Sequence, residues 1–565
     1  MTPSQPFRPS RARERQGPLT LGQLAQLVEY EEVLARAPEA AWTRTLTQRW
    51  AVPAGNEVSA VRDALALLAR RHEVLRTTFE RDDSGNPVQR VWAPGSERIR
   101  VCDPQVLPGA GEAPDVDAFL ASLRRQPLPC DAEPPIAFHV LAEGDAAKEV
   151  LIVFHHIVAD YRSMQILHRD FLAALAVLAR GGTEPPGAPP RQPIDEALRQ
   201  AARAGQEDDG LEGDRREGDG LEPWREALDA AAPTPYPRWD ESRSAGYTAT
   251  FSSESLQHAV SVLSQRNGLW PAQALLGLYA FVVARYTGLP STSLCVISSN
   301  RFTYPSGVHC CALRVPVVLP TGELPPEGLM KAVAAATRNL HRNADHDARA
   351  LRALVAGRQE ATGFNTRFRL EYNFFSRRGG AVGAGTPRGP RSPGGFRHEP
   401  TEPADPTLTY LAARPGRGTE PMVLFLESNE AFLPLPAAEA LLRAMEGLGA
   451  ELAGRAELAE PAEHDPPVHW TAYLSHALDA RPAVPDLLAF RSGHVDVRRI
   501  VRAVDAELGD GRARGVEVRD RGTPRERLVL RLSDPWGADA VADLLARLRR
   551  RAYSDPSLVI PTEVM

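Results

Sequence analysis

The chain has few of the features that mark secreted, metal-binding or membrane proteins. Its five cysteines in 565 residues are odd in number and irregularly spaced, which argues against a disulfide scaffold and favours a reduced, cytoplasmic environment. No run reaches the roughly eighteen uninterrupted apolar residues of a membrane span. Residues 1–17 are rich in proline and arginine without an apolar core, which predicts a disordered leader and not a signal peptide. The sequence therefore predicts a protein that stays in the cytoplasm.

The chain also lacks a basic domain. Its formal net charge is −6, and no basic face interleaved with aromatic residues occurs, which argues against nucleic acid as a partner. Cys310 and Cys311 have no second cysteine pair or histidine cluster at ligand spacing, so we expect no metal site. The apolar fraction of 43% is that of an ordinary globular protein, and the length leaves room for several domain-sized cores.

What the sequence does contain is an apolar run that ends in two adjacent histidines. Residues 150–154 predict a buried strand, His155 and His156 follow it, and Asp160 precedes a segment of helical periodicity at 162–178. Neighbouring side chains that leave a strand point in opposite directions, so one histidine should face a cleft as a base while the other packs behind it. Asp160 should orient a loop or a ring nitrogen. On this pattern alone, two structural histidines beside a turn are an open alternative.

A second segment, residues 64–79, predicts a helix that runs into a strand, and its residues carry a resemblance. The condensation domains of nonribosomal peptide synthetases have an early signature Arg-His-Glu-x-Leu-Arg-Thr-x-Phe, which this chain matches at Arg71, His72, Glu73, Leu75, Arg76, Thr77 and Phe79. Their central His-His-x-x-x-Asp-Gly motif follows as His155, His156 and Asp160, with Tyr161 in place of glycine. The resemblance implies that Arg71 and Arg76 are structural residues that tie the helix end to the sheet.

The resemblance extends over most of residues 18–460 and implies the fold. It predicts an α/β (α+β) protein of two chloramphenicol-acetyltransferase-like lobes in a V-shaped pseudo-dimer, with the histidine motif at the floor between them. The N-terminal lobe is expected at residues 18–178 and the C-terminal lobe at residues 222–458.

Composition marks the remaining boundaries. Residues 179–221 predict a connector with a mobile acidic loop, and residues 377–400 are so rich in glycine, proline and arginine that they predict a disordered insertion. Residues 465–565 predict an accessory α/β module, whose periodicity favours helices near 495–508 and 538–551 and strands near 515–518, 527–532 and 558–560.

The resemblance also names a partner for the motif aspartate. In the family, the strand after the helix that corresponds to residues 270–288 ends in an arginine that pairs with this aspartate, so Arg301 is the expected partner of Asp160. A buried pair of this kind would be a structural brace. An ordinary surface arginine is the alternative, because the chain is rich in arginine.

Four further residues are expected at the substrate tunnel. His309 and Leu313 replace a glycine and an asparagine of the family, and Asn373 lies in a segment that resembles its Phe-Asn-Tyr strand. His309 is either a new polar group in the channel or a packed histidine. Tyr161 would narrow the tunnel, form a hydrogen bond to a substrate, or mark a site that no longer turns over.

The resemblance finally implies a function. The chain is expected to be a free-standing condensation enzyme, an acyltransferase that joins an acyl or aminoacyl group on a carrier protein to an amine or hydroxyl. His156 would remove the proton of the nucleophile or stabilise the intermediate, while His155 and Asp160 hold the site in shape. No metal or bound cofactor is implied, because the phosphopantetheine arm belongs to the acyl or peptidyl carrier proteins that are the partners. Neither nucleic acid nor a membrane is expected.

Two alternatives remain open. One is a coenzyme A-dependent acyltransferase of the same superfamily. The other is a non-catalytic platform that recruits a carrier protein or a tailoring enzyme, which Tyr161, His309 and Leu313 favour, whereas both histidines and Asp160 favour chemistry.

Overall fold

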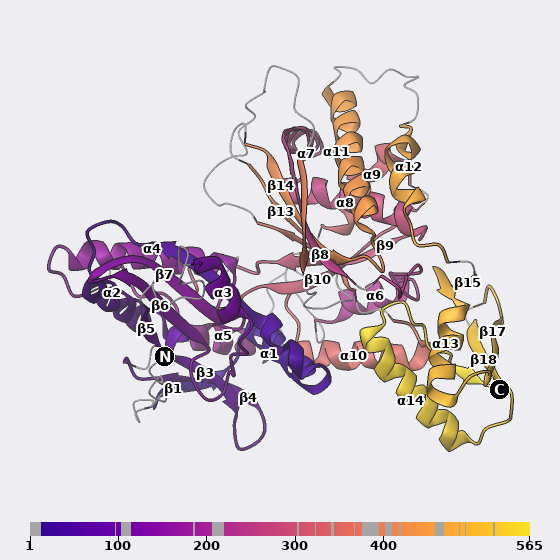
Figure 1. The fold of residues 1–565 in the computed structure, drawn as a ribbon, viewed down its shortest axis with the longest axis horizontal. Coiled ribbons are helices and arrows are strands. Elements are labelled where there is room, and N and C mark those ends of the chain that lie inside the picture. The colour runs from indigo at the N-terminus through magenta and orange to yellow at the C-terminus, as the bar shows by residue number, and fades with distance from the viewer. Residues whose placement is uncertain are drawn as a thin grey trace. The chain divides into compact units, whose positions relative to one another are not determined.

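The computed structural model describes most of the chain. The described residues are 13–95, 98–102, 115–184, 187–205, 220–243, 245–301, 304–322, 324–338, 340, 344–365, 368–375, 395–401, 409–416, 420–457, 468–484, 486–491, 493–523 and 526–565. The chain divides into two compact units (Figure 1). Unit 1 comprises Met1–Asp219, Ser299–Leu313 and Asp345–Arg349, and unit 2 comprises Gly220–Ser298, Arg314–Ala344 and Ala350–Met565.

Unit 1 contains a four-stranded sheet of order β2-β7-β6-β5 and a three-stranded sheet of order β1-β4-β3. Its strands are β1 (Arg13–Pro18), β2 (Thr45–Ala51), β3 (Thr77–Arg81), β4 (Pro87–Trp92), β5 (Ile99–Cys102), β6 (Ile136–Glu143) and β7 (Ala146–His155). Its helices are α1 (Leu21–Arg36), α2 (Val58–Arg71), α3 (Val116–Arg124), α4 (Tyr161–Leu178) and α5 (Pro193–Gly205).

The apolar run that precedes the histidines is the centre of the larger sheet. β7 pairs antiparallel with β2 on one side and with β6 on the other. Phe154 and Ile152 pack into the cluster formed with α2 and α4, whereas Val153 and Leu151 pack with residues of α3 on the opposite face. Because both faces of the strand are covered, its sequence is continuously apolar instead of alternating.

Unit 2 is built on a seven-stranded sheet of order β10-β9-β11-β13-β14-β8-β12. The strands are β8 (Gly246–Ser253), β9 (Thr292–Ser298), β10 (Leu313–Leu319), β11 (Leu370–Phe374), β12 (Gly395–Thr401), β13 (Thr409–Arg414) and β14 (Met422–Asn429). The helices are α6 (Glu222–Ala230), α7 (Glu254–Asn267), α8 (Pro271–Thr287), α9 (Leu329–Ala336), α10 (Ala348–Thr362), α11 (Leu435–Glu457) and α12 (Trp470–Asp479).

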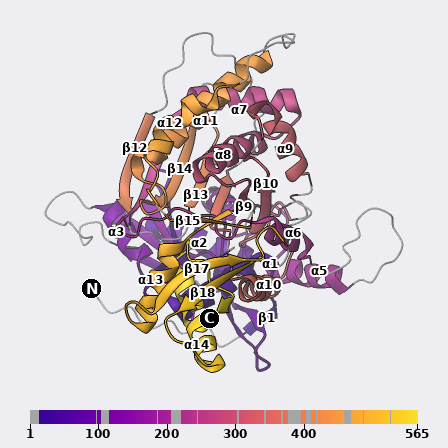
Figure 2. The ribbon, with the colours of Figure 1, turned by 90° about the vertical axis from the view of Figure 1, so that its right-hand side faces the viewer.

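The core of unit 2 lies between one face of this sheet and the helices α7, α8, α11 and α12 (Figure 2). α8 is apolar on every side and almost wholly buried, as expected of a central core helix. Val468, Leu474 and Ala477, around α12, belong to the same core cluster. α12 therefore packs with the body of unit 2.

The rest of the C-terminal region forms its own cluster within unit 2. Its elements are β15 (Leu487–Phe490), β16 (Gly493–Asp496), α13 (Val497–Leu508), β17 (Ala513–Arg519), β18 (Arg527–Leu532), α14 (Ala538–Ser554) and β19 (Glu563–Val564). We call this set of elements, residues 487–565, the C-terminal cluster. It packs on Phe364, just after α10, and Asn365 donates its side-chain amide to the carbonyls of Ala552 and Asp555 at 2.9 Å.

Three segments differ from the sequence-based expectation. Residues 13–17 of the expected disordered leader form most of β1, and residues 395–400 of the expected disordered insertion form most of β12. Both strands gain their order from hydrogen bonds to a neighbouring strand, which composition does not reveal. The last strand is Glu563–Val564 and not 558–560, whose side chains are buried instead. Residues 1–12, 206–219 and 376–394, which include most of these expected disordered segments and of the acidic loop, lie outside the described residues.

Among the described residues, no single helix is long and apolar enough to cross a membrane. α7 and α8 pass the length and composition test only as a pair, and they are bent by 110° relative to each other.

Candidate functional site

His155 is the buried member of the histidine pair. It ends β7, has no exposed surface, and meets the ring of Tyr30 edge-on at a centroid distance of 4.7 Å. The amide of Ile157 donates to His155 Nδ1 at 3.1 Å, so this nitrogen is unprotonated and the proton lies on Nε2. Burial lowers the pKa of His155 to about 3. His155 is therefore a neutral packing residue behind the site.

His156 is the member that reaches solvent. It lies in the turn after β7 and is partly exposed. Its Nδ1 is 3.1 Å from the carbonyl oxygen of Ala159, and since a carbonyl only accepts, Nδ1 carries the proton. Nε2 then has a free lone pair. Because burial lowers the pKa of His156, the ring is neutral near neutral pH and its Nε2 can accept a proton.

Asp160 caps α4 and anchors the turn that holds His156. Its Oδ1 accepts the amide of Ser163 at 2.8 Å and Arg301 Nη2 at 2.6 Å. Its Oδ2 accepts the amide of Cys311 at 3.0 Å. Burial alone would raise the pKa of Asp160, but the Arg301 guanidinium and the Ser163 amide outweigh it and lower this pKa below its usual value. The carboxylate is charged and held by three hydrogen bonds, so it orients the loop and does not transfer protons.

Arg301 is buried beside this carboxylate and also joins two loops of unit 1. Nη1 donates to the carbonyl of Gly307 at 2.6 Å, and Nη2 also donates to Ser163 Oγ at 2.7 Å. The hydroxyl of Ser163 in turn donates to the carbonyl of His309 at 2.7 Å. The structure thus brings Arg301 and Asp160 together. It also adds Ser163 to the site, a residue that the sequence analysis did not select. Its position three residues after Asp160, the N-cap residue of α4, was the only sequence signal for this contact.

His309 is a packed residue of the same network. It is 2% exposed, and Nδ1 lies 2.9 Å from the carbonyl of Cys310, so Nδ1 carries the proton. Nε2 accepts from the Cys311 thiol at 3.3 Å. Burial lowers the pKa of His309 to about 4. His309 is therefore packed among protein groups, which is one of the two alternatives stated from the sequence. Leu313 is also buried.

Tyr161 is the first residue of α4 and exposes 40% of its surface. It is not among the described residues with positive φ, so the backbone here has no need for the glycine of the family.

The early signature contributes structural contacts. Arg76, 3% exposed, donates Nε to the carbonyl of Ala69 at 3.1 Å and also hydrogen-bonds the carbonyl of Trp92 in β4. Arg71 donates to Asp170 Oδ2 at 3.1 Å. His72 Nε2 lies 2.9 Å from the same oxygen, a pairing that sequence reasoning missed because 98 residues separate the two.

Asn373 lies on β11 in unit 2, where its side-chain amide donates to the hydroxyl of Tyr410 at 2.8 Å. The structure therefore places this residue in a different unit from the histidine motif.

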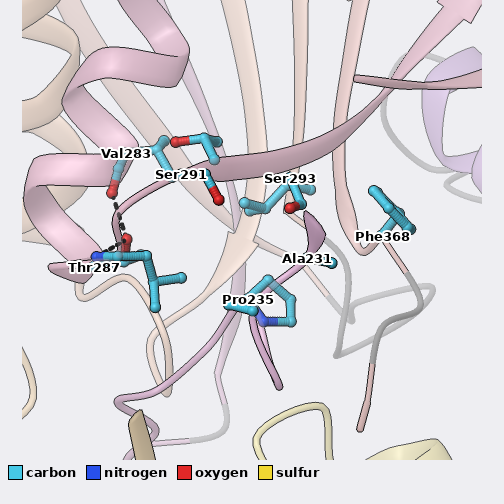
Figure 3. Close-up of a pocket in the computed structure, with 11 residues that line it drawn as sticks. Ala231, Pro235, Val283, Thr287, Ser291, Ser293 and Phe368 are labelled. Carbon is cyan, nitrogen blue, oxygen red and sulfur yellow. Dashed lines mark hydrogen bonds between the residues drawn. The ribbon is translucent and has the colours of Figure 1, made fainter. Parts of the chain in front are cut away.

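Unit 2 also has a small cavity of about 20 Å³ beneath the end of α8 (Figure 3). Its wall is formed by Ala231, Pro235, Phe368 and the hydroxyl-bearing Ser291, Ser293 and Thr287, whose Oγ1 donates to the carbonyl of Val283 at 2.9 Å. This volume holds about one water molecule, and the wall has no titratable group. Among the described residues, no group of three or more His, Cys, Asp or Glu side chains could hold a metal ion.

Comparison with known proteins identifies the architecture. The phosphinothricin tripeptide synthetase PhsC of Streptomyces viridochromogenes is 31% identical over 235 residues, which are 40% of this chain and 21% of that protein. The matching segment thus spans about a fifth of the length of that relative. The chondramide synthase cmdD of Chondromyces crocatus is 25% identical over 251 residues, which are 43% of this chain and 6% of that protein.

Solved structures share the fold. The condensation domain from the monacolin K polyketide synthase MokA superposes with a TM-score of 0.59 at 16% identity, covering 79% of this chain and 99% of that one. The X-domain solved in complex with OxyB from teicoplanin biosynthesis gives 0.58 at 20% identity, with coverages of 81% and 98%. The described residues thus have the mixed α/β, chloramphenicol-acetyltransferase-like fold of condensation domains. Residues 50–301 match the family model described as condensation domain.

Proposed function

We propose that this chain catalyses condensation of an acyl or aminoacyl thioester, held on the phosphopantetheine arm of a carrier protein, with an amine or hydroxyl acceptor. The observation that carries the proposal is the state of His156. Its Nδ1–H is committed to the Ala159 carbonyl, its ring is neutral, and its Nε2 is left to accept a proton. A neutral imidazole beside a partly exposed turn is the group that proton transfer near neutral pH requires.

The proposed reaction balances with this one base. The acceptor nitrogen or oxygen attacks the thioester carbonyl, and its proton passes to His156 Nε2. The carbon–sulfur bond then breaks, the amide or ester forms, and the carrier thiolate takes the proton from His156. His155 is bonded to the Ile157 amide of the turn, and the Asp160–Arg301 pair anchors the same turn, so neither is assigned a proton transfer. No metal or bound cofactor has a step in this scheme.

Intact-protein mass spectrometry of acyl-loaded carrier proteins tests the proposal directly. With candidate amines and alcohols, the parent should release the acyl group as product, and His156→Ala should lower turnover by about 10²–10⁴-fold, the usual worth of a general base. His168→Ala, which removes another partly exposed histidine of unit 1, is the matched control and should react as the parent. Equal turnover by His156→Ala and the parent would remove His156 from the mechanism.

Two alternative functions are separated by the same assay. Turnover with acyl-coenzyme A and without a carrier would identify the coenzyme A-dependent acyltransferase. The platform alternative draws support from Tyr161, which occupies the glycine position of the motif, and from the X-domain, a fold neighbour that was solved in complex with OxyB. A parent that is inactive with every donor, yet binds a carrier or tailoring enzyme, would replace the catalytic proposal.

A further inference from the structure

A cleft of about 600 Å³ lies in unit 2 between the end of α10 and the C-terminal cluster. Its wall is formed by Ala361, Thr362, Phe364, Phe490, Arg491, Asp520, Glu526, Arg527 and Thr562. Sites for small molecules usually measure about 300–1,000 Å³, so the cleft has the volume of a ligand site. None of its residues belongs to the histidine motif.

The cleft presents charges of both signs. Arg527 Nη2 donates to Asp520 Oδ2 at 2.9 Å at the rim, where both side chains are about half exposed. Glu526 is only 7% exposed, and its carboxylate accepts the amides of Arg491 at 3.2 Å and Gly522 at 3.0 Å, one on each oxygen. A carboxylate oxygen accepts about two hydrogen bonds, so the oxygens of Glu526 retain capacity for a further donor.

The backbone around these charges is held in an uncommon conformation. Among the described residues, four that are not glycine have positive φ, and two of them line this cleft: Arg491 at 53° and Asp520 at 51°. Such residues persist only where the surroundings over-determine them, and they gather at ligand sites. At Arg491 the conformation accompanies two contacts, the amide donated to the Glu526 carboxylate and Nη2 donated at 2.8 Å to the Glu526 carbonyl.

One polar group in the wall is left without a protein partner. Thr562 Oγ1 is buried and has no hydrogen-bond partner among the described residues. A buried hydroxyl without a partner costs free energy that a bound ligand would recover. The apolar part of the wall is the exposed Ala361 and, beneath the surface, the edge-to-face pair Phe364 and Phe490, with centroids 5.7 Å apart and planes at 84°.

We propose that this cleft binds a small zwitterion of the α-amino acid class. Its carboxylate would lie against Arg491 and Arg527, its ammonium group against Asp520 and Glu526, and its side chain against the two phenylalanines. An ion of one sign would lie beside side chains of its own charge, and an apolar molecule would desolvate the half-exposed Arg527 and Asp520 without return. The inference goes beyond the condensation chemistry and does not depend on it.

Calorimetric titration of the full chain tests the ligand class with three related probes. We expect L-phenylalanine to bind, and phenethylamine and 3-phenylpropionate, which lack its carboxylate and its ammonium group respectively, to bind at least about tenfold more weakly, since each loses charge-assisted hydrogen bonds. Equal affinity for all three probes would overturn the zwitterion assignment. Absence of binding by phenylalanine, leucine and methionine alike would overturn the site.

Variants locate the binding. Arg491→Gln and Arg527→Gln should each weaken phenylalanine binding by about tenfold or more. The matched control is Arg531→Gln. Arg531 lies on β18, the strand of Arg527, pairs with Glu517 at 2.7 Å and is not part of the cleft wall. Unchanged affinity in both cleft variants, or an equal loss in the control, would contradict the proposal.

Thr562→Val separates a loss of ligand binding from a loss of folding. Valine has the shape of threonine without the hydroxyl, so the unliganded melting temperature should hold or rise while phenylalanine binds several-fold more weakly. A variant that melts like the parent and binds phenylalanine equally would show that the unpartnered hydroxyl takes no part.

Discussion

The histidine-motif site of unit 1 and the cleft of unit 2 use charge in opposite ways. In the motif site, Asp160 and Arg301 are 7% and 5% exposed, and backbone and side-chain groups of two segments, the start of α4 and the connection between β9 and β10, contact them. In the cleft, Arg527 and Asp520 are about half exposed and their pair lies at the rim. Removing one partner of a buried pair costs ~3–5 kcal/mol, whereas an exposed pair is worth ~0–1 kcal/mol. An aspartate–arginine pair therefore stabilises the fold in unit 1, whereas the same pair of residue types in the cleft of unit 2 contributes little to stability.

The largest expected effect tests this difference directly. Asp160→Asn keeps the shape of the side chain but leaves the Arg301 guanidinium buried without a counter-charge, so we expect a loss of about 3–5 kcal/mol of unfolding free energy. Denaturant unfolding of the full chain measures it. Asp520→Asn is the matched variant in the cleft and should cost at most ~1 kcal/mol. Similar losses in the two variants would break the comparison.

Acidification should weaken unit 1 through its buried histidines. The pKa of His155 is lowered to about 3 and those of His309 and His139 to about 4, so the folded chain resists protonation that the unfolded chain accepts near pH 6.5. Unfolding therefore takes up protons, and stability falls as the pH drops from about 6.5 towards these values, by up to ~1.4 kcal/mol per pH unit for each histidine.

Melting temperature measured between pH 7 and pH 5 checks this expectation. Asp160 contributes little in that window, because its pKa is lowered below its ordinary value and it stays ionised in both states. His155→Gln should reduce the fall in melting temperature between pH 7 and pH 5 by the contribution of one histidine. A profile that is flat in the parent would show that these rings are protonated in the folded chain.

A glycine where the C-terminal cluster meets α10 should be sensitive to a single methyl group. Gly363 has a φ of 71°, and a Cβ there would lie 1.8 Å from the carbonyl oxygen of Ile560. Gly363→Ala should cost at least ~1–2 kcal/mol from the left-handed backbone alone and loosen the C-terminal cluster. Thermal unfolding and limited proteolysis measure the two effects.

Gly357→Ala, within α10 itself, supplies the control. A Cβ at Gly357 meets nothing within 4 Å, and alanine is the better helix former by ~1 kcal/mol, so this variant should be slightly more stable than the parent. Equal stability of the two variants would mean that the close contact between Gly363 and the Ile560 carbonyl does not contribute to folding.

The smallest effect is expected at Tyr161. Its exposed ring predicts that Tyr161→Phe changes stability by no more than ~0.5 kcal/mol and leaves turnover within a few-fold of the parent. Product formation from a loaded carrier measures the second quantity. A loss of more than about tenfold would make the Tyr161 hydroxyl a participant in the reaction, at variance with its place on the surface of unit 1.

Several elements could be predicted because their signals are local. The apolar run before His155 and the helical periodicity after Asp160 indicated β7 and α4, and the apolar residues that recur at helical spacing over 270–288 indicated α8. Burial on both faces of a strand and on all sides of a helix leaves a direct trace in composition. Residues 13–17 and 395–400 could not be predicted in this way, because their order comes from the strands β4 and β8 beside them.

The sequence by itself determined that two histidines leave a buried strand and that an aspartate begins the next helix. Only the tertiary structure decided which histidine is buried, which nitrogen of each ring holds the proton, and that His309 is packed against Cys311. It alone gathered the walls of the cleft from segments between residues 361 and 562. The physical reason is that secondary structure follows from the periodicity of neighbouring residues, whereas protonation state and ligand sites depend on burial and hydrogen-bond partners that distant segments supply.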